Sequence, residues 1–425
     1  MGKEIYEFKN YYIAIFSVNY LFQGIDQSLF AIIIPIYLIS FIGVLDASAI
    51  AFLGSIISLP WILKILYGMI GDKFGSKRFG RRRPWIIGMV SFAGIMWIIM
   101  GIPNFYTPSN AITAFTIMGF LIFLGMAFGD TIIDGLVLDI TPKEKLGRTS
   151  GYTWGLRSVG AIAGGPAFAI LLVSGLLNVP MLFIIVGILT ILSSFITIFI
   201  KEPKEFPEAK LGLHLKNMFN NARDWKAYAF SLFAAMVENV GILIISIFIL
   251  VKMGVLTSVG TELSLPSGDV DVYLYNAFIT MIVSLGVVAG AIIAGQIADK
   301  KTRRISVLLA FIITTITLFL MIIPLAWPIL LIFSSFVGIA IGWRHSSYAA
   351  VVTEISKLHP EMDSTYYSLC NAFANLGGIL GLTLSGFVLE LTASYIYVFI
   401  FVAVISNLGL IGFLLLNPKD YEHTL

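Results

Sequence analysis

Apolar runs fill most of the chain and leave only short polar connections between them. Each run reaches the length of about 20 residues that an apolar helix needs to cross a hydrocarbon core. Because a helix satisfies its own backbone hydrogen bonds in lipid, the sequence predicts an all-α membrane protein. We expect twelve transmembrane helices, at 11–39, 48–71, 84–102, 110–140, 150–175, 180–200, 225–251, 272–298, 305–326, 328–356, 365–391 and 393–416.

The composition excludes a soluble globular protein. Hydrophobic residues make up 58% and charged residues 12% of the 425 residues, and the mean hydropathy is +0.94. A typical soluble domain has about 25% charged residues. This chain therefore has too little polar surface to cover a globule of its size in water.

Basic side chains gather on one side of the predicted twelve-helix arrangement. Of the 27 lysines and arginines, 23 fall in loops or tails on that side, and the exceptions are Lys64, Arg157, Arg344 and Lys252. The positive-inside rule makes this side cytoplasmic. We therefore expect an integral plasma membrane protein with both termini in the cytoplasm. The basic loops are too short to indicate binding of nucleic acid.

A basic turn between two apolar runs occurs once in each half of the chain. The first turn reads GMIGDKFGSKRFGRRRP at 68–84, and the second reads GQIADKKTRR at 295–304. A device repeated in this way is typical of a protein built from two related bundles. We predict an N-terminal six-helix bundle at 1–200, a cytoplasmic linker at 201–224 and a C-terminal six-helix bundle at 225–425.

Acidic residues recur at a nearly constant spacing between the two halves. Asp26 precedes Glu238 by 212 residues, and Asp139 precedes Glu354 by 215 residues. This spacing supports a pseudo-symmetric pair of bundles. Glycines recur in the same way, and we expect them to let helices approach closely; they are Gly160, Gly164 and Gly165 in span five and Gly377, Gly378, Gly381 and Gly386 in span eleven.

These features together resemble the major facilitator superfamily. Within it, LPWILKILYG at 59–68, FGRRRP at 79–84 and DTIIDGLVLD at 130–139 are similar to the group of muropeptide permeases, acetyl-coenzyme A transporters and folate-biopterin transporters. The run RFGRRRP at 78–84 is also similar to sucrose and glycoside cation symporters. The resemblance implies two six-helix bundles and a carrier that works by alternating access.

Charged residues at the cytoplasmic ends of the helices predict a gate. Asp72 and Asp299 each close a helix beside a basic turn, where a carboxylate can pair with arginine or bind a helix N-terminus. Arg81 belongs to the first turn, and Asp139 and Glu354 end spans four and ten. We interpret all five as gating residues. The alternative is that the basic turns only fix topology.

Asp26 and Glu238 lie deep in spans one and seven. A charged residue near the bilayer centre costs a few kcal/mol unless it is paired, hydrated or neutralised. A carboxyl group that takes up and releases a proton there can couple solute binding to proton movement. We therefore regard both residues as candidates for coupling or binding, and the alternative is a neutral acid that joins packed helices.

A second set of candidates combines acids and arginines. Asp130 and Asp134 are one helical turn apart and share a face, and Arg157 on the next span is expected to pair with them. The pairing either responds to a proton or an anionic solute, or braces the helices permanently. Arg344 is expected to bind an anionic group or to pair with Glu238, and the sequence leaves open whether the neighbouring His345 takes part.

Signals for enzyme chemistry are missing from the sequence. It has no phosphate-binding Walker loop and no cysteine and histidine spacing for a metal, so we expect no enzyme activity, no cofactor and no metal site. We predict a monomeric secondary active transporter in the lipid bilayer. It moves a small polar organic solute, sugar-like or an anionic metabolite, together with a proton or another cation.

Two other functions fit the same pattern. One is an efflux antiporter or uniporter of the same fold. The other is a non-transporting factor that assembles membrane complexes. An assembly factor has no need of ionisable side chains deep in its spans, so those residues favour coupled transport.

Overall fold

The computed structural model describes residues 8–75, 79–202, 218–265, 271–359 and 363–422. Within these ranges twelve helices are long and apolar enough to cross a membrane, which confirms the predicted fold class. The spans are Tyr11–Ile42, Ala47–Gly71, Arg83–Met100, Ala111–Val137, Gly155–Val173, Val179–Phe199, Ala222–Lys252, Val272–Ala298, Arg303–Leu320, Trp327–Ser356, Thr365–Thr392 and Tyr395–Leu414.

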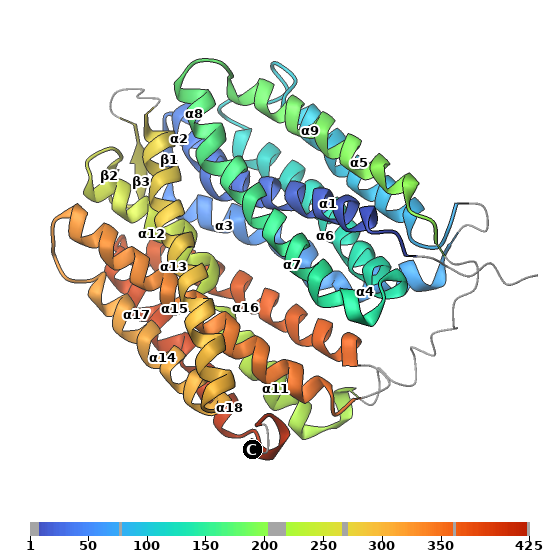
Figure 1. Ribbon diagram of the computed structural model, residues 1–425. Coiled ribbons are helices and arrows are strands. Elements are labelled where there is room, and N and C mark those ends of the chain that lie inside the picture. Colours follow the sequence, from blue (N-terminus) through green and yellow to red (C-terminus); the bar gives the residue numbers. More distant parts are fainter. Residues whose placement is uncertain (1–7, 76–78, 203–217, 266–270, 360–362, 423–425) are drawn as a thin grey trace, which may run out of the picture. The chain divides into compact units, whose positions relative to one another are not determined.

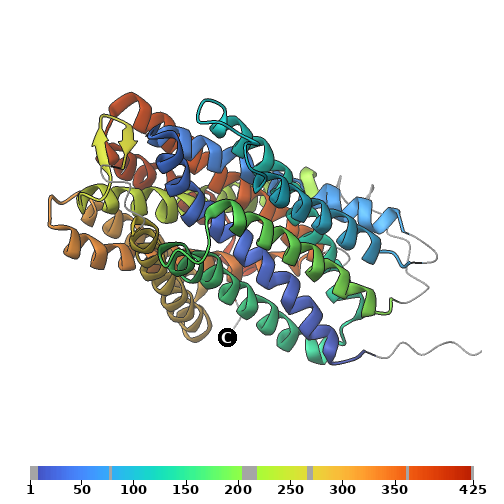
Figure 2. The ribbon, with the colours of Figure 1, turned by 90° about the horizontal axis from the view of Figure 1, so that it is seen from above.

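The helices group into two compact units, and the first unit comprises Met1–Ile34 and Leu63–Leu211. Its main helices are α1 (Tyr11–Ser28), α4 (Lys64–Lys73), α5 (Arg83–Met100), α6 (Ala111–Ile140), α7 (Lys143–Ile162) and α9 (Val179–Phe195). Helix α1 packs along α7, and α5 packs against both α6 and α9. Figures 1 and 2 show α1 and α7 side by side.

The second unit comprises Pro35–Ile62 and Gly212–Leu425. From the second half of the chain it contains α11 (Ala222–Ala235), α12 (Glu238–Lys252), α13 (Val272–Lys300), α14 (Arg303–Leu320), α15 (Trp327–Ser356), α16 (Asp363–Thr392), α17 (Tyr395–Ser406) and α18 (Leu408–Leu414), followed by the short helix η5 (Pro418–Asp420). Helix α15 packs against α13 and α14, and α16 packs against α11. The predicted linker at 201–224 lies largely outside the described residues.

The first hairpin also contributes to the second unit. Its helices α2 (Ile34–Ile42) and α3 (Ala47–Ser58) lie in the segment that groups with the second unit, and α3 packs against α16. The chain passes from the first unit to the second, and back again, near two irregular helical segments of this hairpin. These are the π-helix η1 (Leu29–Ile33) and the 3-10 helix η2 (Leu59–Leu63). Pro35 and Pro60 account for these irregularities, because proline removes a helical hydrogen bond.

Another break occurs in span five. The π-helix η3 (Ala163–Ala167) contains Pro166 and separates α7 from α8 (Phe168–Val173). It contacts both α1 and η1. Short π-helices often occur at functional positions, and here two of them lie together in the core of the first unit. Span six ends in the 3-10 helix η4 (Ile196–Phe199).

A small antiparallel sheet joins two connecting segments of the second unit. It consists of β1 (Val44–Asp46), β2 (Thr257–Val259) and β3 (Glu262–Ser264) in the order β1, β3, β2. Asp46 lies opposite Glu262 and accepts a hydrogen bond of 2.9 Å from the Thr261 hydroxyl. The sequence did not predict these strands, since each is only three residues long.

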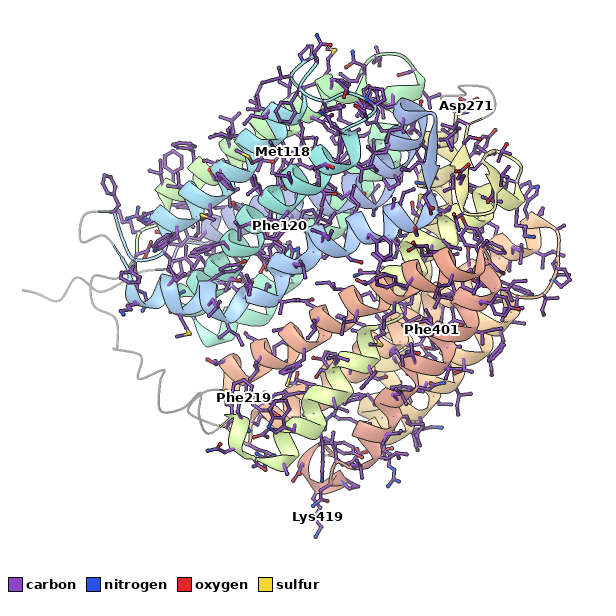
Figure 3. All side chains as sticks on the ribbon, turned by 180° about the vertical axis from the view of Figure 1, so that it is seen from behind. Met118, Phe120, Phe219, Asp271, Phe401 and Lys419 are labelled. Carbon is purple, nitrogen blue, oxygen red and sulfur yellow. The ribbon has the colours of Figure 1, made fainter. Side chains whose placement is uncertain are left out.

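Large apolar side chains remain exposed on the outer helices. Ile312 and Ile316 on α14 are each 54% exposed, and Ile411 on α18 is 57% exposed. Figure 3 shows such carbon-rich side chains along both units, with Phe401 on α17 and Lys419 extending beyond the helices at η5. In water, apolar surface of this extent favours association, whereas lipid is its natural solvent.

Glycines bring the backbones of neighbouring helices together, as predicted. A Cβ atom on Gly160 of α7 would lie 1.9 Å from the carbonyl oxygen of Leu21 on α1. A Cβ atom on Gly377 of α16 would lie 1.8 Å from the carbonyl oxygen of Leu232 on α11. The same kind of contact therefore joins corresponding helices in each half.

This packing predicts opposite effects at two nearby glycines. Gly160→Ala is expected to lower the free energy of unfolding by about 1–3 kcal/mol or more, because the methyl group meets backbone that must shift. Gly155→Ala on the same helix meets nothing within 4 Å, so it is expected to raise stability by about 0.5–1 kcal/mol through helix propensity. Thermal unfolding in detergent measures both. Equal effects would contradict the close approach of α1 and α7.

Candidate functional site

Charged side chains meet inside the first unit at α4 and α6. The ammonium group of Lys64 forms an ion pair with Asp130 and lies 3.8 Å from Oδ2 of Asp134. The Asp130 side chain is 2% exposed, whereas that of Asp134 is 47% exposed. One acid is thus held tightly and the other loosely by the same cation. The expectation that the two acids share a face is confirmed.

Helices α1 and α7 complete this charged cluster, which we define as Tyr20, Lys64, Asp130, Asp134 and Arg157. The Tyr20 hydroxyl donates a hydrogen bond to Asp134. The charge of Arg157 acts electrostatically on Tyr20, Lys64 and Asp134. All five side chains come from membrane-spanning helices, where each charge needs a partner or water.

A lysine that we did not select takes part in this cluster. Lys64 lies within 4 Å of both acids, and Arg157, which we expected to pair with them, acts electrostatically on Asp134. The guanidinium group of Arg157 donates a hydrogen bond of 2.9 Å to Gln27 on α1. Sequence reasoning did not select Lys64 as a site residue, although a lysine within an apolar span was a usable signal.

Asp26 lies on another face of α1 and is not part of the charged cluster. Its side chain is 1% exposed, and neither oxygen has a hydrogen-bond partner among the described residues. Trp97 on α5 acts on the Asp26 carboxyl group, and its ring packs against Phe30 with 5.1 Å between ring centroids. Asp26 is therefore buried between the packed helices of the first unit.

In the second unit Glu238 occupies a break in span seven. It is the first residue of α12, directly after a turn at Met236 and Val237 that ends α11. A helix N-terminus favours a carboxylate there, and discontinuous helices often form binding sites in transporters. The side chain is half-buried. No described cation lies within ion-pair distance of it.

Arg344 is buried and forms no ion pair with the acids that the structure describes. Its residue is 3% exposed, its guanidinium lies 3.9 Å from the ring centroid of Phe311, and Nη2 donates to the Ser406 carbonyl at 3.4 Å. Nε and Nη1 have no partner among the described residues. The expected pair with Glu238 is not formed. His345 is exposed.

Arginines of both basic turns pair with the acids that end spans four and ten. Arg81 contacts Asp139 at 2.8 Å, and Arg82 contacts the same carboxylate. Arg303 contacts Glu354 at 3.0 Å. The two halves thus build equivalent contacts, each of them within its own unit. The side chains of Asp72 and Asp299, which we also assigned to gating, lie outside the described residues.

Two glutamates that the sequence reasoning missed add to these contacts. Glu202 accepts hydrogen bonds of 2.8–3.0 Å from the backbone N–H groups of residues 81–83. Glu422 accepts bonds of 3.0 and 2.7 Å from those of Arg303 and Arg304. Each carboxylate therefore binds the N-terminus of the third helix of its half. The sequence feature that could have identified these two glutamates is an acidic residue just after the last span of each half.

This arrangement predicts a measurable stability effect. Glu202→Gln is expected to lower the free energy of unfolding by about 1–2 kcal/mol, because a charged N-terminal cap becomes neutral. Glu262→Gln serves as the control, since Glu262 is exposed on β3. Thermal unfolding in detergent compares the two variants. A Glu202 variant as stable as the control would contradict the capping role.

Comparisons with known sequences agree with this architecture. The BT1 family profile matches residues 23–276, and the Major Facilitator Superfamily profile matches residues 241–424. A folate-biopterin transporter of Synechocystis sp. is 31% identical over 160 residues, which cover 35% of this chain and 29% of that protein. The putative transporter AmpG 1 of Rickettsia conorii is 35% identical over 118 residues, 27% of this chain and 28% of that protein. The matched stretches span less than a third of these relatives.

Solved structures share the fold at low sequence identity. A bacterial homolog of the human lysosomal transporter Spinster superposes with a TM-score of 0.67 at 16% identity over 100% of both chains. A D-xylose-proton symporter gives 0.67 at 14% identity, covering 97% of this chain and 99% of that one. The fold is therefore that of the major facilitator superfamily. Because the BT1 match covers more than half of the sequence, the chain belongs to the BT1 family.

Proposed function

We propose that this protein is a proton-coupled secondary active transporter that moves a small polar organic solute across the plasma membrane by alternating access. The observation that carries the proposal is the ion pair of Lys64 with Asp130 and the adjacent, more accessible Asp134. Ionisable groups in membrane spans are costly and mark pathways for ions or solutes. A protein that only assembles membrane complexes has no use for them.

The unequal environments of the two acids suggest their roles. Asp130 is buried against Lys64 and anchors the cation. Asp134 is more exposed and lies farther from the Lys64 ammonium group, so a proton can reach it without breaking the pair of Lys64 with Asp130. Protonation of Asp134 changes the charge of the cluster and therefore the relative free energies of its conformations. We assign Asp134 as the proton-coupling residue.

The solute is a small polar organic molecule, sugar-like or anionic. Folates and pterins are candidates because a relative is named a folate-biopterin transporter, and sugars are candidates because a structural neighbour is a D-xylose-proton symporter. We further propose that the carrier is monomeric, with both termini in the cytoplasm. The division into bundles at 1–200 and 225–425 with a linker at 201–224 belongs to the same proposal.

The remaining candidates receive narrower roles. Glu238, at the broken helix of span seven, is the carboxylate of the second unit that a solute or proton contacts. Asp26 and Arg344 are buried between the packed helices of their units. We therefore assign them to coupling through helix packing and not to direct contact with the solute. Arg81, Asp139 and Glu354 hold the cytoplasmic ends of the helices within each half.

Transport assays in proteoliposomes test the proposal. Radiolabelled folate, biopterin and D-xylose are offered with and without an inward pH gradient, and protein-free liposomes give the background. Accumulation of at least one probe that needs both protein and gradient is the expected result. Asp26→Asn and Glu238→Gln are measured in parallel, and full accumulation by both variants would remove these two residues from the coupling mechanism. Equal uptake of all probes with and without the gradient would contradict proton coupling.

A further inference from the structure

Arg344 on α15 is a buried cation whose hydrogen-bond donors are only partly used. The residue is 3% exposed and lies within span ten. Its Nη2 donates to the Ser406 carbonyl at 3.4 Å, whereas Nε and Nη1 have no hydrogen-bond partner among the described residues. None of the described acids lies within ion-pair distance of the guanidinium group. A positive charge in a membrane span is costly without a counter-charge.

The side chains around Arg344 add a further unused donor. Phe311 of α14 covers one face of the guanidinium group, with 3.9 Å from Cζ to the ring centroid. Hydrogen bonds must therefore be made in the guanidinium plane, where its N–H groups point. Ser406, the last residue of α17, is 0% exposed, and its hydroxyl has no hydrogen-bond partner in the described part of the chain. Three helices of the second unit thus surround a positive charge and donors that have no acceptor.

We infer that Arg344 binds a small inorganic monoanion, chloride above all, among the packed helices of the second unit. Such an ion supplies the counter-charge and accepts hydrogen bonds from the guanidinium group and from the Ser406 hydroxyl. A spherical halide accepts these bonds without a preferred direction. The bound ion joins α15 to α17 at the point where Arg344 already contacts the Ser406 carbonyl.

The burial of the site selects the size of the anion. Arg344, Phe311 and Ser406 are each at most 3% exposed, so a ligand at the guanidinium group must fit among packed side chains. An organic anion with a larger body does not meet this condition. A doubly charged inorganic anion loses more hydration on burial than a singly charged one. The chloride ion is therefore distinct from the transported solute, and its binding does not depend on the proposed transport cycle.

Thermal unfolding of the purified protein in detergent tests the site without a transport assay. Sodium gluconate is replaced stepwise by sodium chloride at constant ionic strength. We expect a saturable rise of the wild-type unfolding temperature, by about 5 °C when chloride reaches 100 times its Kd. Arg344→Met is expected to unfold at the same temperature in both salts. This variant should fold, because an apolar side chain replaces a buried charge.

A matched control removes a lysine elsewhere in the same unit. Lys419 is exposed on η5 (Figure 3), so Lys419→Met should respond to chloride as wild type does. An equal rise in wild type and Arg344→Met would show a general effect of salt and would overturn the site. A wild-type protein that does not respond to chloride would also overturn it, because Phe311 and water would then be sufficient partners for Arg344.

Ser406→Ala provides a second variant that keeps the cation. Loss of a hydroxyl that donates to the anion is expected to raise the half-saturating chloride concentration about fivefold. An unchanged value would overturn the role of Ser406. Equilibrium dialysis with radiolabelled chloride counts the ions directly, and we expect one bound ion per wild-type chain and none per chain of Arg344→Met. Equal binding by these two proteins would contradict the assignment to Arg344.

Discussion

Lys64→Met is expected to lower the free energy of unfolding by about 3–5 kcal/mol, because it leaves Asp130 buried and charged without its partner. Asp130 is 2% exposed, and its ion pair is with Lys64. The same variant is expected to lose gradient-driven accumulation, since the cation that faces Asp134 is removed. Thermal unfolding in detergent and uptake into proteoliposomes measure the two effects separately.

A double variant distinguishes a purely structural role of Lys64 from a role in transport. Lys64→Met combined with Asp130→Leu removes both buried charges, and such replacements are often neutral or stabilising. We therefore expect the double variant to regain most of the lost stability while uptake stays at background. If uptake returns together with stability, Lys64 is a structural brace only. If Lys64→Met alone is as stable as wild type, the result contradicts the buried position of the Lys64–Asp130 ion pair.

Asp134→Asn is expected to abolish accumulation against a solute gradient while leaving solute exchange within about threefold of wild type. Asparagine still hydrogen bonds to Tyr20 but cannot bind and release a proton, so the cluster stays in the charge state that protonated Asp134 gives it. Wild type, in contrast, is expected to accumulate up to about tenfold for each pH unit. Counterflow and net uptake in the same vesicles provide the measurement.

The pH dependence of exchange adds a second criterion for Asp134. Exchange by wild type is expected to fall as pH rises, because Asp134 loses the proton that the proposed cycle requires and fewer carriers are then ready to bind solute. Exchange by Asp134→Asn should not follow this fall, since the amide has no proton to lose. If both proteins show the same decline, another group is responsible for the proton step, and Glu238 is the next carboxylate to examine.

Sequence reasoning succeeded where the signal was local. Helix length and hydropathy predicted the spans, and the one-turn spacing of Asp130 and Asp134 predicted a shared face that Lys64 now confirms. The glycines that recur in both halves also lie where two helices approach closely. They could be predicted because a residue without a side chain is recognised from the sequence alone. Each of these features depends on residues within a few turns of one another.

Features that depend on how helices rotate against each other were beyond the sequence. That Lys64 pairs with Asp130 depends on the rotation of α4 and α6 about their own axes, which hydropathy does not determine. Arg344 was expected to bind an anionic group or to pair with Glu238, and the structure places its guanidinium group against the ring of Phe311. Glu202 was overlooked because its partners are the backbone N–H groups of residues 81–83, more than one hundred residues earlier.

The central claim is that a proton taken up by Asp134 travels with the solute. A pH-sensitive dye trapped inside proteoliposomes measures this most directly, with a carried solute added outside and no pH gradient imposed. We predict that wild type and Glu262→Gln acidify the lumen as the solute enters and that Asp134→Asn does not. Solute entry through wild type without acidification, or acidification by Asp134→Asn equal to that of wild type, would contradict the account.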